Sequence, residues 1–391
     1  MKISRQKNDG LLVAAVTILL TIGLIMVFSA SAVVAKEKYG SLLYYSGKQI
    51  LWGFLCILTI FIFSRLNYTN YSKKGVPLFG ILISFVSLIG LFLWGDVVNG
   101  AHRWYTLGFA SFQPSELSKI ALIIYFADIF SRKAELIRDW KKGLLPHALI
   151  LCMIILPILF QPDLGTVVMI SLIISTMAFL SNIRFKHVLA GITFIIPAAF
   201  LKIQNNNYQV SRVSNWLDNL TNPLGSGHQI KQSLIGLGRG GLFGSGIGTS
   251  KQKFFFLPDS HTDFVFSILG EEIGYVGTTI VLILFLIILW RGISISKHAP
   301  STFAQFLAVG FTMHLVLYAF INVAVVTMLL PTTGLPMPFI SYGGSSLMGV
   351  GISVGILINI SRKTHQPGLD VKLEQFKEDR RSFYDNLIGT R

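Results

Sequence analysis

The stretch FFFLPDSHTDFVFSILGEEIGYVG, residues 254–277, joins a long polar segment to an apolar helix. Asp263 stands at the junction, directly after Thr262. An ionisable acid beside a membrane segment is costly, so its presence calls for a reason. One hypothesis is that Asp263 or Thr262 caps the free backbone N–H groups of the first helical turn. The other is that Asp263 is a reactive carboxylate at the boundary between water and membrane.

The composition is typical of a membrane protein. Of the 391 residues, 52% are hydrophobic and 13% are charged, and a soluble domain has about twice that charged fraction. Apolar runs of roughly 18 or more residues recur from end to end, which indicates spanning helices. We therefore predict an all-α polytopic membrane protein with about ten transmembrane helices.

The formal net charge of +15 is large for a chain with so few charged residues. In a membrane protein, positive charge sets orientation and meets anionic headgroups, so it does not indicate nucleic-acid binding. The two cysteines, Cys56 and Cys152, both lie inside apolar runs. A disulfide framework or a thiolate metal site is therefore not expected.

The apolar runs predict ten spans with approximate boundaries. They cover residues 11–34, 47–64, 76–94, 114–131, 145–161, 164–181, 187–203, 263–292, 303–327 and 338–361. Lysine and arginine gather in alternate connecting segments, a bias that puts both termini in the cytoplasm. Residues 1–361 are expected to form a single transmembrane domain. Residues 362–391 are expected to form a cytoplasmic tail that is solvated or disordered.

One predicted extracytoplasmic segment, residues 202–262 between spans seven and eight, is much longer than the others. A loop of this length in a compact protein usually has a function, and we expect it to fold back over the membrane surface. Its GLGRGG run, residues 236–241, formally fits a dinucleotide-binding motif, but the strand and helix around that motif are missing. The segment is basic. Its cations are Arg212, Lys231, Arg239, Lys251 and Lys253.

Four further ionisable residues lie at the outer ends of predicted spans. Glu116 and Lys119 are three residues apart, so they share a helix face and can pair, either to fix packing or to face a cavity. Asp163 is placed either to cap span six or to join a polar site. Arg103, beside Trp104, suits an anionic headgroup, although both residue types are also ordinary interface anchors.

The stretch LPTTGLPMPFISYGGSS, residues 330–346, has three prolines and three glycines and cannot continue a helix. Irregular backbone at this depth is tolerated where it lines an enclosed cavity.

Glu271 and Glu272 need partners that the sequence does not identify. His314 is expected to be a packed histidine, since no spacing resembles a metal site. Acids and cations beside a hydrophobic wall favour a lipid-linked substrate that carries phosphate.

Six motifs in family order resemble the SEDS family, named for shape, elongation, division and sporulation. They are NGAHRW (99–104), FQPSELSK (112–119), QPDLGT (161–166), QSLIGLGRGGLFGSGIG (232–248), LPDSHTDFVFSILGEEIG (257–274) and LPTTGLPMPFISYGGSS (330–346). The fourth and sixth are more similar to the division and sporulation branch than to the elongation branch. Where many relatives have LPEAHTD, this chain has LPDSHTD.

The resemblance implies a peptidoglycan glycosyltransferase. It would polymerise lipid II on the outer face of the bacterial cytoplasmic membrane, release undecaprenyl diphosphate, and work at the division septum. Its expected partners are a single-span class B penicillin-binding protein and other divisome membrane proteins. The essential family aspartate falls on Asp263, and the other motif acids and lysine fall on Glu116, Lys119 and Asp163.

The chemistry of such a reaction suits these residues. A carboxylate such as Asp263 can take the proton from the attacking sugar hydroxyl as general base. The leaving diphosphate needs arginine, lysine or a divalent cation such as Mg²⁺ or Mn²⁺. The candidate substrate-binding residues are Arg103, Glu116, Lys119, Asp163, Arg212, Arg239 and His261.

Three alternatives stay open from the sequence. A lipid II flippase also needs polar residues inside the membrane, but it needs them through both halves, whereas these cluster at the outer end. A scaffold for division proteins would leave the outer acids without a purpose. Within the family, an elongation-type polymerase is the alternative to a division-type one.

Overall fold

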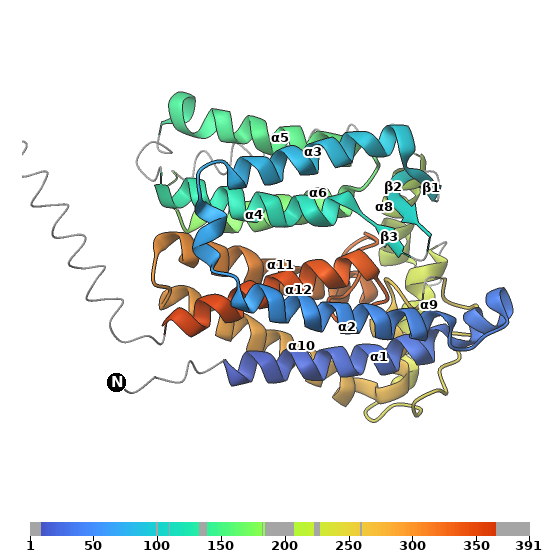
Figure 1. Ribbon diagram of the computed structural model, residues 1–391. Coiled ribbons are helices and arrows are strands. Elements are labelled where there is room, and N and C mark those ends of the chain that lie inside the picture. Colours follow the sequence, from blue (N-terminus) through green and yellow to red (C-terminus); the bar gives the residue numbers. More distant parts are fainter. Residues whose placement is uncertain are drawn as a thin grey trace, which may run out of the picture.

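The computed structural model describes residues 9–98, 101–108, 110–132, 139–181, 183, 207–222, 227–258 and 260–364. Its long helices lie side by side along one direction (Figure 1). They are α1 (Gly10–Tyr39), α2 (Tyr44–Arg65), α3 (Val76–Trp94), α4 (Pro114–Arg132), α5 (Leu145–Phe160), α6 (Leu164–Phe179), α10 (Val265–Lys297), α11 (Thr302–Val326) and α12 (Gly344–Thr364). A small sheet, α8 (Asn207–Thr221) and α9 (His228–Gly240) lie at one end, which we call the capped end. The short helices η1 (Tyr68–Ser72) and η3 (Trp140–Leu144) precede α3 and α5.

Within the described residues, six helices are long and apolar enough to cross a membrane. They are α1, α2, α3, α10, α11 and α12. The shorter α5 and α6 and the more polar α4 lie parallel to them in the same bundle (Figure 1). The predicted all-α polytopic architecture is therefore confirmed. Nine of the ten predicted spans correspond to helices, and the seventh, 187–203, lies outside the described residues.

Local caps set the two ends of α1. The side chain of Asp9 accepts a hydrogen bond from Leu12 N (3.2 Å), and α1 then ends at Gly40, whose left-handed φ of 71° suits glycine. The buried Asp9 also pairs with Arg291 of α10, with 2.7 Å between Oδ2 and a guanidinium nitrogen. This cap therefore also joins α1 to α10 at the end of the bundle opposite the capped end (Figure 1).

Glycines bring α12 close to α2. A methyl group on Gly344 would lie 2.4 Å from the ring of Trp52, and one on Gly351 would lie 3.0 Å from the Cys56 carbonyl oxygen. Small residues are the usual means by which membrane helices approach this closely, because packing replaces the hydrophobic effect there. The segment before α12 is thereby held against the rest of the bundle.

The connection before α4 is a three-stranded antiparallel sheet, which the sequence did not predict. Its strands are β1 (Asp96–Val98), β2 (Ala101–Leu107) and β3 (Ala110–Phe112), in the order β1-β2-β3. Oδ2 of Asp96 accepts a hydrogen bond from Thr106 N (2.9 Å), and hydrogen bonds from Thr106 lower the pKa of Asp96. The hairpin positions Arg103 in the middle of β2.

The described part of the long segment 202–262 contains two helices, α8 and α9. Glycines explain how α9 lies against α10. A methyl group on Gly240 would lie 1.9 Å from the Gly270 carbonyl oxygen, so no larger residue fits there. This glycine run thus allows close packing of α9 on α10.

The predicted start of the last span was wrong. Its helix, α12, begins at Gly344 and not at residue 338, because the prolines and glycines of 330–343 keep that segment irregular. The helix continues to Thr364, three residues past the predicted end. Arg362 donates from NH1 to the Ser64 carbonyl (2.9 Å) in this last turn. The remaining predicted tail, 365–391, lies outside the described residues.

Candidate functional site

Hydrogen bonds fix the position of the backbone at Asp263 and at the two residues before it. The carbonyl oxygens of His261, Thr262 and Asp263 each accept one hydrogen bond from elsewhere in the bundle. The donors are, in that order, Tyr342 N (2.9 Å), Ser341 Oγ (2.5 Å) and Asn322 Nδ2 (2.8 Å). Asp263 is consequently placed by the segment before α12 and by α11, far away in sequence.

The capping hypothesis for Asp263 is wrong. The N-cap residue of α10 is Phe264, whose side chain makes no capping hydrogen bond. The Phe264 carbonyl accepts from Ser267 N (2.9 Å), which begins the helix without help from Asp263. Asp263 therefore directly precedes the N-cap position, and its side chain is half-buried.

The carboxylate instead approaches Arg212 of α8 at Gly334. A methyl group built on Gly334 would lie 3.5 Å from Asp263 Oδ2 and 3.8 Å from both terminal nitrogens of Arg212. Gly334 has a φ of 73°, a left-handed conformation that only glycine adopts without strain. This glycine lets an acid and a cation from distant segments meet over one backbone position.

Arg212 also lines an apolar groove of about 440 Å³. The groove lies between α6, α8, α11 and the segment 330–335. Its apolar walls include Leu164, Val168, Leu172, Val213, Ile321 and Leu335. A mostly apolar cavity with few polar groups is the usual form of a small-molecule site.

A second, more polar cavity of about 260 Å³ lies between α8 and α9 and shares Arg212. Its lining includes Asn215, His228 and Gln229. Arg212 donates from NH1 to the Thr332 carbonyl at 3.3 Å, which holds its guanidinium between the two cavities. A ligand with an apolar part and a charged part could thus be bound around this one arginine.

Asp163 and Arg103 shape the wall of the groove. Asp163 caps α6, with 3.2 Å from Oδ1 to Thr166 N and 2.9 Å from Oδ2 to Thr166 Oγ1. Arg103 donates from Nε to the Gln161 carbonyl (3.0 Å) and from NH2 to the Pro162 carbonyl (2.5 Å). Both therefore hold the turn between α5 and α6. Direct contact of either with substrate stays a prediction.

Glu116 and Lys119 form the pair that their spacing predicted. The Lys119 Nζ lies 2.7 Å from Glu116 Oε2, and it donates to the Tyr318 hydroxyl of α11 at 2.6 Å. Both side chains are buried, and Lys119 is among the largest fully buried side chains of the described residues. The pair joins α4 to α11 near the capped end.

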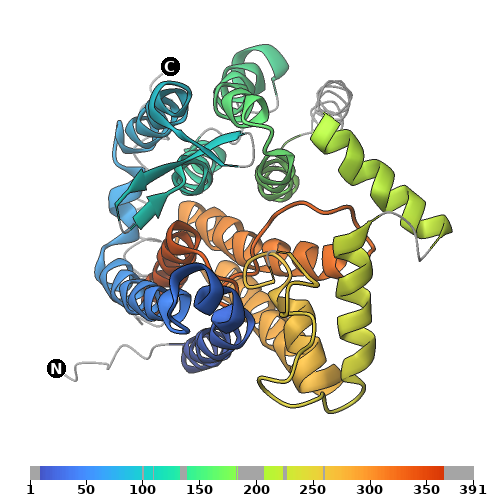
Figure 2. The same ribbon diagram turned by 90° about the vertical axis from the view of Figure 1, so that its right-hand side faces the viewer.

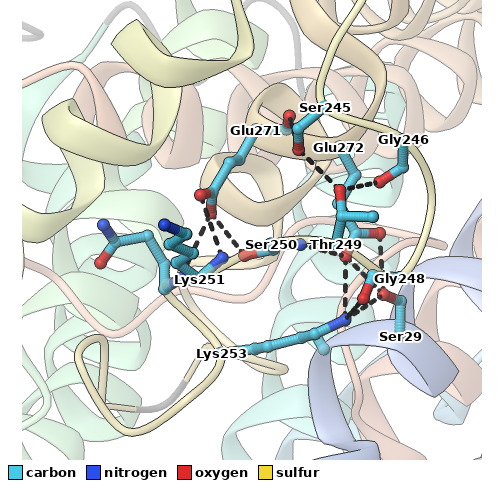
Figure 3. Close-up of polar contacts among 12 residues, drawn as sticks. Ser29, Ser245, Gly246, Gly248, Thr249, Ser250, Lys251, Lys253, Glu271 and Glu272 are labelled. Atoms are coloured by element: carbon cyan, nitrogen blue, oxygen red, sulfur yellow. Dashed lines mark hydrogen bonds and ion pairs between the residues drawn. The ribbon is translucent and has the colours of Figure 1, made fainter.

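The partners of Glu271 and Glu272, which the sequence did not identify, come from the preceding loop and from α1 (Figure 3). Glu272 accepts from Ser29 Oγ at 2.6 Å and lies 3.3 Å from Lys253 Nζ. Glu271 accepts from Ser250 Oγ (2.5 Å) and from Lys251 N (3.0 Å). Two successive buried acids need hydrogen-bond donors, and the sequence signal for these donors was the serine and the two lysines of SKQK at 250–253.

Arg239 lies beside this acidic cluster, and its contact with substrate stays a prediction. Its NH1 lies 3.7 Å from Glu271 Oε1, and its side chain is 42% exposed. Beside it, α10 is broken at Gly274, whose φ is 75°. The freed N–H groups of Tyr275 and Val276 donate to the carbonyls of Gly241 and Leu242 (2.9 and 3.1 Å). The loop before Asp263 is thus fastened to α10 itself.

Asn322 is a further candidate site residue, which the sequence did not single out. Its Nδ2 donates to the carbonyls of Asp263 and Leu335, both at 2.8 Å, so one buried amide joins the acid to the groove wall. A lone asparagine inside the apolar run of span nine was the signal, because buried amides in membrane helices usually bridge neighbours.

Within the described residues, no three or more His, Cys, Asp or Glu side chains group together as metal ligands would. The cation that the protein itself brings to the carboxylate is Arg212.

The fold and the site define a polytopic membrane protein with a carboxylate and a guanidinium beside an apolar groove. The family model described as "Cell cycle protein", for FtsW, RodA and SpoVE, matches residues 10–366. The chain belongs to this family, and the resemblance drawn from its motifs is confirmed.

Two relatives and two solved structures illustrate the similarity. Stage V sporulation protein E of Bacillus subtilis is 40% identical, over 93% of this chain and 99% of the relative. "Probable peptidoglycan glycosyltransferase FtsW" of Geobacter sulfurreducens is 36% identical, over 92% and 96%. The rod shape determining protein RodA of Thermus thermophilus has a TM-score of 0.67 at 26% identity, over 92% and 98%. A chain from "a peptidoglycan synthase complex" has a TM-score of 0.73 at 26% identity, over 92% and 99%.

Proposed function

We propose that this protein is a peptidoglycan glycosyltransferase that polymerises lipid II. The observation that carries the proposal is the meeting of Asp263 and Arg212 over Gly334, beside an apolar groove. Lipid II has a long apolar tail, a diphosphate and a disaccharide. A groove, a cation and a carboxylate, in that order, match these three parts.

In the proposed reaction, Asp263 accepts the proton of the acceptor 4-hydroxyl as that oxygen attacks the anomeric carbon of the donor. The bond from this carbon to the diphosphate oxygen breaks, and the diphosphate leaves with the electron pair. Arg212 stabilises the negative charge that develops on it. A single displacement inverts the anomeric centre, from α in the donor to β in the polymer.

The direct test is polymer formation by the purified full-length protein supplied with lipid II. We expect the Arg212→Gln variant to lose about tenfold to a hundredfold in rate, the scale of a hydrogen bond to a charged group. Lys231→Gln, another cation of the capped end, is the matched control and should stay within about twofold of wild type. A wild-type rate in Arg212→Gln would remove this residue from the diphosphate site.

We extend the proposal to the branch of the family and to the partner, with support from the relatives. The 40% identical relative is a sporulation protein, so we place this chain in the division and sporulation branch, with a septal role. One structural neighbour belongs to a synthase complex that coordinates polymerization and crosslinking. We therefore assign a class B penicillin-binding protein as partner. The same polymer assay, run with and without that partner, should give a clearly higher rate for the complex, and equal rates would exclude activation by the partner.

From the lysine and arginine bias, we propose that the capped end lies outside the bacterial cytoplasmic membrane and both termini inside. A reporter inserted after Asn222, between α8 and α9, should therefore respond on the extracytoplasmic side. The same reporter fused to the C-terminus should respond on the cytoplasmic side. Identical responses at both positions would contradict this orientation.

A further inference from the structure

An aromatic cluster surrounds His261 at the capped end. We call Tyr39, Tyr44, Tyr45, His261 and Tyr342 the aromatic ledge. Tyr39 and Tyr44 stack with ring centroids 3.7 Å apart, and Tyr44 meets Tyr45 edge-on at 5.3 Å. Tyr45 in turn lies 4.6 Å from the His261 ring and 5.3 Å from the Tyr342 ring. The ledge is thus continuous from the corner between α1 and α2 to a residue two positions before Asp263.

The ledge is accessible and carries a cation. Tyr39 is 49% exposed, and Tyr44, Tyr45, His261 and Tyr342 are all partly exposed. Lys48 donates from Nζ to the Tyr44 hydroxyl at 2.9 Å and lies 4.4 Å from the Tyr44 ring centroid. Tyrosines often mark membrane interfaces singly. Here the rings pack on one another in a continuous row that ends beside the candidate catalytic residue Asp263. Anchoring at a membrane interface does not require such an arrangement.

The ledge and the groove are formed by different elements around Asp263. The groove side brings α6, α8 and Arg212, whereas the ledge brings α1, α2 and the backbone of Tyr342, whose N–H donates to the His261 carbonyl. Seen from the capped end, the blue corner between α1 and α2 and the yellow-green α8 are well separated (Figure 2). A saccharide at Asp263 can therefore extend over the ledge while its lipid stays in the groove.

We infer that the aromatic ledge is a saccharide-binding surface for the glycan on which Asp263 acts. Sugar rings have C–H faces that pack on aromatic rings, and their hydroxyls can pair with tyrosine hydroxyls. The Lys48 ammonium complements the carboxylates of peptide-bearing sugars. The inference rests on the proposed function, and it adds a site that holds the strand beside the reacting bond.

The first test is binding of a soluble probe, a lipid-free peptidoglycan tetrasaccharide with its stem peptides, to the purified full-length protein by calorimetry. We expect Tyr39→Ala and Tyr44→Ala each to weaken binding about threefold to tenfold, the range for loss of one aromatic contact. Tyr44→Phe keeps the ring and should stay within about twofold of wild type. Tyr275→Ala, an exposed tyrosine outside the ledge, is the matched control and should not change affinity.

The second measurement is the length distribution of polymer made from lipid II. Loss of a holding surface should shorten the strands in Tyr39→Ala and Tyr44→Ala, while the rate of the first coupling stays near that of wild type. Tyr44→Leu preserves apolar volume and replaces Tyr44→Ala if the alanine variant has a lower melting temperature. Unchanged affinity and length in folded ledge variants, or equal losses in Tyr275→Ala, would overturn the inference.

The two proposals fail separately. Saccharide binding by the wild-type protein needs no turnover, so a protein that binds the tetrasaccharide through the ledge but forms no polymer would keep the ledge and lose the proposed activity. A protein that forms polymer yet shows no ledge-dependent binding or strand length would keep the activity and lose the ledge.

Discussion

Asp263→Asn is expected to abolish polymerisation almost completely while leaving the fold intact. The amide has the same size as the carboxylate but cannot take a proton, and loss of a general base usually lowers the rate about 10²- to 10⁴-fold. The backbone contacts of this residue involve its carbonyl, which the substitution keeps. Since α10 begins without a side-chain cap, we expect little change in stability.

The measurement is rate and length of polymer formed from lipid II by the purified variant with its partner. Asp218→Asn, the same chemical change at an exposed position of α8, is the control and should retain activity. Melting temperatures of both variants should match that of wild type. Polymerisation at a near wild-type rate by Asp263→Asn would show that the base lies elsewhere, with Glu116 and Asp163 as the next candidates.

Removal of either member of the Glu116–Lys119 pair should give the largest loss of stability. Lys119→Ala leaves the Glu116 carboxylate buried without its cation, and breaking such a pair costs about 3–5 kcal/mol. The double variant Glu116→Gln/Lys119→Met removes both charges at similar volume, so it should recover much of this loss. Unfolding of the purified protein in detergent measures the effect.

The chain contains a matched control for this prediction in the same helix. Asp128 and Arg132 also pair, at 2.6 Å, but the arginine side chain is 48% exposed. Arg132→Ala should therefore cost less than about 1 kcal/mol. If Lys119→Ala were no more destabilising than Arg132→Ala, the buried pair would not have the energetic role that its burial implies.

Two features of the site were already evident in the sequence because they depend on near neighbours. Residues three apart on a helix share a face, so the pairing of Glu116 with Lys119 followed from spacing alone. Asp163 directly precedes the first turn of α6, where a carboxylate reaches free N–H groups. The helices themselves followed from the length of the apolar runs.

The capping hypothesis for Asp263 had the same local basis and was wrong. In the sequence alone, an acid at the N-cap position cannot be told from an acid one residue before it. Only the structure shows that Phe264 occupies the N-cap position and that the Asp263 carboxylate approaches Arg212 instead. Three contacts from α11 and the segment before α12 decide this placement.

The sequence by itself determined a bundle of apolar helices, the end at which its polar residues gather, and the pairs formed within one helix turn. The tertiary structure alone decided which helices lie opposite one another. It brought Arg212 to Asp263, Ser29 to Glu272, and Tyr45 to His261. The reason is physical. The pattern of apolar residues determines which side chains must be removed from water, but burial against any neighbouring helix meets this requirement. The particular helix pairs are therefore selected by side-chain packing.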